Sequence, residues 1–172
     1  INYNEIVHVE ELARQSGAAP ERIPRIYRGA DVRLEVPGSG VWSDTLPIVN
    51  DAAEAIMATA RGASPDNPAW IVPVGPGTNV ASAILMAREE GLDLHERINE
   101  FNGNNDPWSL YVIAESGVEL WIMPAPVGAL VKIDKRTESD WYADHPLGAY
   151  LKKITPARDK PLYDPAVLGA II

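Results

Sequence analysis

Apolar residues recur at helical spacing in several parts of the chain, and each of these stretches is bounded by a capping residue or a glycine. In the first stretch, Ile6 and Val9 fall on one face, and Gly17 follows as a stop. Asn50 and Asp106 precede two of the later stretches as capping residues. The pattern predicts helices over residues 5–15, 51–61, 79–90, 107–116, 138–154 (which Pro146 begins or interrupts) and 166–172.

Shorter apolar runs between these helices are typical of strands. Residues 70–74 form an unbroken apolar run, as in a strand buried on both faces of a sheet, and residues 23–27 and 118–124 predict two further strands. Strands and helices alternate, which predicts an α/β fold with an open, mainly parallel sheet and helices on both faces. Residues 92–105, however, are polar and rich in Asn. Either two helices pack in succession there, or a strand is absent from the sequence.

Size and charge narrow the range of functions. A length of 172 residues, 46% of them apolar, predicts a single domain over residues 1–172. The 15 Lys and Arg against 24 Asp and Glu give a net charge of −9, which disfavours nucleic acids and anionic membranes as partners. Without Cys there is no disulfide framework, thiolate nucleophile or Cys-ligated zinc. No apolar run is long enough to span a bilayer, so we expect a soluble protein. The sequence does not determine the compartment, for which the cytoplasm is the working assumption.

The loop after the apolar run of residues 70–74 is the first candidate site. In open α/β sheets, ligands bind at the carboxyl ends of the strands, where a helix N-terminus offers free N–H groups. Val74-Gly-Pro-Gly-Thr78 leads directly from strand to helix and is therefore a candidate wall of such a site. The loop has neither GxGxxG spacing nor the GxxxxGK[ST] lysine, so dinucleotide and triphosphate binding are not supported. The alternative is a tight turn in which Thr78 caps the helix.

Two further sets of polar residues precede helices. Glu100 and Asn102 stand at alternating positions, so an extended chain would aim both side chains at the same ligand. A carboxylate and an amide together can bind the vicinal hydroxyls of a sugar, and the alternative is a solvated loop. Asp164 is either a helix cap or a ligand for a hard cation such as Ca²⁺. The three His residues lack metal-ligand spacing, and we expect them to be surface or packing residues.

Five segments, in order along the chain, resemble motifs of the nucleoside hydrolase family, the inosine-uridine type of ribohydrolase. IPRIYRGAD resembles the family's IPVYRGAD strand and loop, and PVGPGTNVA resembles its xxGPLTNxA motif. The most specific segment is EFN followed by NDP, which resembles EFNxxxDPxAA. The segments are residues 23–31, 51–56, 73–81, 100–107 and 115–118.

The resemblance implies a hydrolase that breaks the N-glycosidic bond between ribose and a purine or pyrimidine base, an activity of nucleoside salvage. In the family a Ca²⁺ ion binds the ribose diol and a water molecule. Carried over to this chain, the Val74 backbone carbonyl and the Asp164 carboxylate are metal ligands. Glu100 and Asn102 contact the ribose, and Tyr163 stands near the leaving base. The implied partner is a small-molecule nucleoside, and a homo-oligomeric assembly is compatible with the resemblance.

Two departures from the family keep a second hypothesis open. The family's N-terminal DTDxxxDD cluster, which supplies the general base and most of the metal's negative charge, has no counterpart here. Tyr163 stands where the family commonly has His. We therefore expect the domain to be incomplete at the N-terminus, before the EFN motif and at the C-terminus. The alternative function is that of a catalytically inactive relative that binds ribose or nucleosides, and a third is a purely structural α/β domain.

Overall fold

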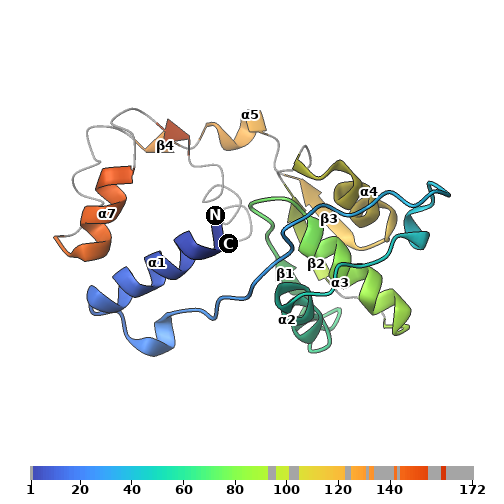
Figure 1. Cartoon of the computed structure of the whole chain (residues 1–172), viewed down its shortest axis with the longest axis horizontal. Coiled ribbons are helices and arrows are strands. Elements are labelled where there is room, and N and C mark those ends of the chain that lie inside the picture. The colour runs from blue at the N-terminus through green and yellow to red at the C-terminus, as the bar shows by residue number, and fades with distance from the viewer. Residues whose placement is uncertain are drawn as a thin grey trace. The chain divides into compact units, whose positions relative to one another are not determined.

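The described residues fold into two compact units (Figure 1). One unit is formed by Tyr27–Ala125, and the other by the residues up to Ile26 and the described residues from Pro126 on. None of the helices in the described part of the chain is both long and apolar enough to cross a membrane. The structure, a computed structural model, describes residues 2–92, 96–100, 105–122, 125–130, 132–133, 142, 144–154 and 160–161.

The Tyr27–Ala125 unit contains a three-stranded parallel sheet with β2 in the middle. Its strands are β1 (Ala69–Ile71), β2 (Glu96–Glu100) and β3 (Glu119–Ile122). The interpretation that residues 92–105 contain no strand is therefore wrong. β2 has a polar sequence and is a strand because it pairs with a neighbour on each side, a tertiary effect that composition does not report.

Three helices of this unit pack side by side. α3 (Thr78–Glu89) connects β1 to β2, α4 (Pro107–Glu115) connects β2 to β3, and α2 (Asp51–Ala60) contacts α3. Successive right-handed crossovers between neighbouring parallel strands place their helices on the same face of the sheet, and α3 and α4 indeed contact each other. These helices form one layer. The predicted fold also has helices on the opposite face of the sheet, and none of these three helices forms that second layer. The second layer therefore stays a prediction.

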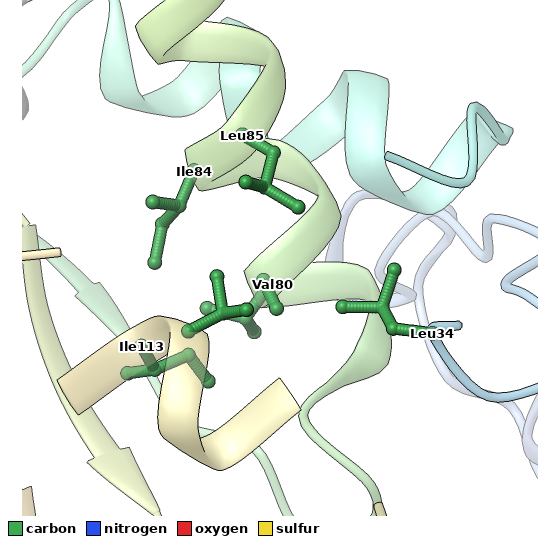
Figure 2. Close-up of a cluster of buried hydrophobic side chains, with 7 residues drawn as sticks. Leu34, Val80, Ile84, Leu85 and Ile113 are labelled. Atoms are coloured by element: carbon green, nitrogen blue, oxygen red, sulfur yellow. The ribbon is translucent and has the colours of Figure 1, made fainter. Parts of the chain in front are cut away.

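Apolar side chains of α3 and α4 form the main core of this unit. Val80, Ile84 and Leu85 of α3 pack with Ile113 of α4 and with Leu34. Figure 2 shows this cluster, with Leu34 near the N-terminal end of α3. All five side chains are nearly excluded from water, so the helix layer is fixed on the sheet by burial of apolar area. Half-buried side chains that complete the core include Trp42, Ile48, Ile71, Trp108, Val118 and Leu120.

α2 begins as its sequence predicts. The Asn50 side chain caps the helix by accepting a hydrogen bond from the Ala53 N–H at 3.0 Å. One turn further on, Met57 is buried against the alanines Ala83 and Ala87 of α3. These small side chains allow the two helices to approach closely, which brings α2 into the same layer as α3.

Two tryptophans lie on the sheet face opposite this core. Side chains alternate along a strand, so Trp70 and Trp121 point away from the face that carries Ile71 and Leu120. Their rings meet edge to face, 5.2 Å apart and at 88°. Because β1 and β3 are separated by β2, this ring pair reaches across the middle strand. Trp121 is still 41% exposed.

The irregular segment 34–48 is attached to α3 and α4 by side-chain hydrogen bonds. The Ile48 N–H donates to the hydroxyl of Ser82 on α3 at 3.1 Å. The indole N–H of Trp108 on α4 donates to the hydroxyl of Thr45 at 3.0 Å. Ser82 and Thr45 are both buried, so these bonds fix the segment against the helix layer.

In the other unit, α1 (Asn2–Gln15) packs against α7 (Pro146–Ile154). The ring of His8 meets that of Tyr150 edge to face, with centroids 5.1 Å apart, and the Tyr150 hydroxyl donates a hydrogen bond to Glu5. The helix predicted over 5–15 is confirmed, and Pro146 begins α7 rather than interrupting it. The other described elements are η1 (Pro20–Arg22), η2 (Trp42–Asp44), α5 (Ala125–Gly128) and the antiparallel pair β4 (Lys132–Ile133) and β5 (Lys160–Pro161).

Two of the three histidines have packing or capping roles; the packing of His8 agrees with the sequence analysis, and the capping by His145 was not predicted. His8 packs on a tyrosine ring, as above, and His145 caps α7 by accepting a hydrogen bond at Nδ1 from the Gly148 N–H at 3.0 Å. His95 lies outside the described residues. The described histidines therefore stabilise the helix pair.

The strand predicted over residues 23–27 is wrong. Ile23 has an extended backbone, with φ −93° and ψ 113°, but residues 23–27 pair with no other part of the described chain. Pro24 contributes to this outcome, because a proline removes one of the N–H donors that a strand ladder needs. The helix predicted over 166–172 and most of the stretch 138–145 lie outside the described residues.

Candidate functional site

The loop between β1 and α3 lies at the carboxyl edge of the sheet, the edge where the three parallel strands end. Val74 stands on this loop, three residues beyond the end of β1, and is 52% exposed. No group of the described chain donates a hydrogen bond to its backbone carbonyl. Val74 is thus exposed at this edge, and its role as a metal ligand stays a prediction.

The carboxylate of Asp106 connects three segments just behind this loop. Its Oδ2 accepts hydrogen bonds from the Thr78 hydroxyl at 2.6 Å and from the Leu34 N–H at 3.3 Å. Its Oδ1 accepts a bond from the Ser109 N–H at 3.1 Å and so caps α4. Asp106 is only 1% exposed. The carboxylate thus joins the first residue of α3, the start of α4 and the irregular segment 34–48.

Thr78 does not cap α3, contrary to the alternative reading of its loop. The N-cap position belongs to Gly77, which makes no side-chain capping bond, and Thr78 is the first helical residue. Its hydroxyl is used instead as the donor to Asp106. A buried carboxylate needs such donors, because an unsatisfied charge costs more than an unsatisfied hydroxyl.

A second polar contact fixes the first turn of α3 to a loop from earlier in the chain. The Asn79 side chain accepts a hydrogen bond from the Ala30 N–H at 2.9 Å. A Cβ at Gly29 would lie 2.5 Å from the Asn79 amide nitrogen, so any side chain at this position would displace the Asn79 amide. Arg28 and Asp31, which flank this contact, form an exposed ion pair at 3.1 Å. The loop therefore brings one cation and one carboxylate close to the start of α3.

The structure places two of the five residues that the resemblance assigns. Glu100 is the last residue of β2 and pairs with Ile122 of β3, so its backbone stands at the carboxyl edge. Val74 stands beyond β1 at the same edge. Because β1 and β2 are neighbouring parallel strands, the two positions lie at the same edge of the sheet, and both belong to the candidate site at that edge. The Glu100 side chain lies outside the described part, as do Asn102, Tyr163 and Asp164.

One oxygen that the resemblance assigns to a Ca²⁺ ion lies among the described residues. The Val74 carbonyl is a hard donor of the kind that this ion prefers, and no backbone N–H of the described chain donates to it. Ca²⁺ takes about six to eight oxygen ligands, and no group of three His, Asp or Glu side chains in the described chain is placed to hold a metal. The described residues alone therefore do not complete a Ca²⁺ site.

Two hollows lie beside the helices of this unit. A cavity of about 420 Å³ is found where α3 and α4 end, and it is lined by Trp42, Arg88 and Gly117 among others. A shallow groove of about 720 Å³ follows α2, lined by residues that include Asp51 and Met86. The candidate site is thus defined by strand topology and polar contacts, and neither hollow is lined by Val74, Thr78 or Asp106.

Comparison with known proteins gives a likeness at the level of the fold. No family model matches the chain, and no curated protein matches it significantly. A solved structure described as a plant nucleoside hydrolase, the PpNRh1 enzyme, superposes on 98% of this chain with a TM-score of 0.62. The chain has a nucleoside hydrolase-like fold.

This likeness is structural and is not accompanied by close sequence similarity. The two sequences are 18% identical, and the chain spans 64% of the length of that solved structure. The likeness agrees with the family that the five motifs resemble, and it covers nearly the whole chain. At this identity it shows the fold alone, so the activity has to be argued from the site.

Sequence reasoning missed the roles of Asp106 and Asn79. Asp106 was expected to be a helix cap, and it is one, but it also binds Thr78 and Leu34, which are 28 and 72 residues away. Asn79 holds Ala30, 49 residues away. The one signal in the sequence was that both residues lie in motifs that also contain expected ligands. Polar residues that follow the carboxyl end of a strand are candidates for a site.

Proposed function

We propose that the chain is a nucleoside hydrolase domain that cleaves the N-glycosidic bond of ribonucleosides to give ribose and a free base. The observation that carries the proposal is the nucleoside hydrolase-like fold, on which the Val74 loop and the end of β2 meet at one edge. In parallel α/β sheets this edge is where ligands bind.

The proposed substrate contacts follow from the chemistry of a ribose diol. The Glu100 carboxylate accepts hydrogen bonds from hydroxyl groups, and the Asn102 amide both donates and accepts them. Two such groups select a sugar with adjacent hydroxyls. Tyr163 is proposed near the leaving base, where a phenol can stack on the base or donate a proton. In the reaction, water adds to C1′ of the ribose, the bond from C1′ to nitrogen breaks, and the base leaves with a proton.

Ca²⁺ is the proposed cofactor. The Val74 carbonyl and the Asp164 carboxylate are its proposed ligands in this chain. When bound, such an ion orients a water molecule and lowers its pKa. The Val74 carbonyl supports this assignment because no backbone N–H of the described chain donates to it, and the remaining ligands have to come from outside the described residues.

The test is a ribose-release assay on the full-length protein with inosine and uridine, with CaCl₂ or with EDTA. We expect release that EDTA abolishes and added Ca²⁺ restores. Glu100→Ala removes a charged acceptor of sugar hydroxyls and lowers kcat/KM about 10- to 100-fold. The matched control is Glu115→Ala, at the exposed last residue of α4 and so at the opposite edge of the sheet. It keeps the activity of the unmodified protein.

Absence of ribose release from both nucleosides in the presence of Ca²⁺ overturns the enzymatic proposal. Isothermal titration calorimetry with inosine and with ribose then separates the two remaining hypotheses. Binding without turnover identifies the inactive nucleoside-binding relative. No binding identifies a purely structural α/β domain. Equal losses in Glu100→Ala and Glu115→Ala overturn the assignment of Glu100 to the site.

A further inference from the structure

The carboxylate of Asp106 makes more contacts than helix capping requires. One bond, from the Ser109 N–H, is enough to cap α4. The bonds from the Thr78 hydroxyl and the Leu34 N–H come from segments far away in the sequence, and all of them meet at a side chain that is 1% exposed. Burying a carboxylate is costly unless it is fully hydrogen-bonded. The arrangement is therefore stable only when all three segments are placed so that they donate to Asp106 at the same time.

The position of the β1–α3 loop depends on this anchor. Between Val74 and Thr78 the loop consists of Gly75, Pro76 and Gly77. Proline has no N–H to donate, and a Cβ added at Gly75 would meet nothing within 4 Å, so the space beside that residue is open. Among the described residues, the one backbone hydrogen bond from this stretch is accepted by Gly77, from Ala81 within α3. The hydrogen bonds that fix this end of the loop are therefore those made at Thr78 and within α3.

The charge of Asp106 also suits its place between two helix starts. α3 and α4 begin at Thr78 and Pro107, and each helix N-terminus carries partial positive charge. A single carboxylate bound to the first residue of α3 and to the first turn of α4 is attracted by both. This attraction favours one relative placement of the two helices that start at the carboxyl edge.

We propose that Asp106 is a positioning residue of the candidate site: through Thr78 it sets where the Val74 loop stands relative to the end of β2. This inference rests on the proposed function for what the edge binds, and on the contacts above for the coupling. Asp106 itself is buried and touches no substrate. Its effect reaches the ligand through the loop, where a displacement of about 1 Å can cost up to about 100-fold in rate.

The test uses Thr78→Val, which keeps the size and branching of the side chain and removes the donor to Asp106. We expect faster hydrogen exchange of the amides of Val74, Gly75 and Gly77, a rise of about tenfold in the KM for inosine, and a matching rise in the Kd for ribose by calorimetry. Thr78→Ser keeps the hydroxyl and restores all three values. A purely structural role would lower the melting temperature and the active fraction, and would leave the KM and the Kd unchanged.

The matched control is Ser82→Ala, one turn further along α3. It also removes a buried hydroxyl, one that accepts a bond from Ile48 and does not contact Asp106. We expect it to lower the melting temperature and to leave the KM, the Kd and the exchange of the same amides unchanged.

The proposed function and this inference fail in different measurements. If the unmodified protein neither hydrolyses inosine nor binds ribose, the proposed function is wrong, and with it the role of the edge in ribose binding. If the unmodified protein does both, the inference is overturned by unchanged KM and Kd in Thr78→Val, or by equal changes in Ser82→Ala.

Discussion

The two edges of the sheet are held in place by different kinds of interaction. At the carboxyl edge, the buried side chains of Thr78 and Asp106 form hydrogen bonds across long distances in the sequence. At the amino edge, where α3 and α4 end, glycines with positive φ terminate both helices: Gly91 at 66° and Gly117 at 83°. Arg88 there contacts the Trp42 ring at 5.2 Å and the Ser43 carbonyl at 2.7 Å, from an exposed position.

This difference makes the carboxyl edge a better candidate for a site than the amino edge. Side-chain hydrogen bonds with buried partners specify one geometry, because each donor and acceptor must be satisfied at once. A glycine at a helix end specifies only a backbone turn. The cavity of about 420 Å³ lies at the amino edge and the groove of about 720 Å³ follows α2, and neither is lined by Thr78 or Asp106.

The largest effect on this comparison is expected from Asp106→Ala. The change leaves three donors without an acceptor and removes the cap of α4, which we expect to lower the free energy of unfolding by about 4 kcal/mol. Urea denaturation followed by circular dichroism measures the loss. The matched control is Asp44→Ala, whose carboxylate accepts one bond, from the Ser39 hydroxyl at 2.7 Å, in an exposed position. We expect a loss under about 1 kcal/mol there. Similar losses in both variants would show that burial of the carboxylate does not matter.

Local signals in the sequence predicted most helices of the fold correctly. Asn50 and Asp106 cap helices as expected, and the stop glycines Gly17, Gly91 and Gly117 all adopt positive φ at helix ends. Capping and termination depend on residues within one turn of the helix end, so a sequence displays them directly. The pattern of caps and stops therefore located α1, α2, α3 and α4.

Features that depend on distant partners escaped prediction. β2 is a strand through its pairing on both sides with β1 and β3, while its own sequence is polar. Residues 23–27 have the composition of a strand but find no partner in the described chain. In the candidate site, the bond between Thr78 and Asp106 joins positions 28 residues apart, and no local pattern announces it. The five motifs agree with the nucleoside hydrolase-like fold, but they did not predict β2 either, because they left the same gap before the EFN motif.

A second expected effect tests the close approach at the carboxyl edge. Gly29→Ala puts a Cβ 2.5 Å from the Asn79 amide nitrogen, so that side chain must move and release the Ala30 N–H. We expect a loss of about 2 kcal/mol in unfolding free energy. Gly38→Ala is the matched control, because a Cβ there meets nothing within 4 Å and the φ of Gly38 is not positive. A loss in Gly38→Ala as large as that in Gly29→Ala would contradict the steric explanation.

At the amino edge the expected effect is smaller and has a backbone origin. Gly117→Ala forces a side chain into a left-handed conformation with φ 83°, in open space, which costs about 1 kcal/mol. Gly62→Ala controls for the glycine itself, since Gly62 follows a helix without a positive φ. Thermal denaturation of both variants gives the difference. An equal shift in Gly62→Ala would mean that the left-handed backbone of Gly117 is not the cause.

The smallest expected effect separates the two edges by function. Arg88→Ala removes an exposed cation–π contact and one hydrogen bond to the Ser43 carbonyl, and we expect a loss of about 0.5 kcal/mol in unfolding free energy. The KM for inosine should not change, because α3 carries Arg88 in its last turn and Thr78 at the opposite end. Kinetics of this variant beside Thr78→Val therefore compare two ends of one helix. If the KM rises as much in Arg88→Ala as in Thr78→Val, then the whole helix layer positions the loop, and not the hydrogen bonds at the carboxyl edge.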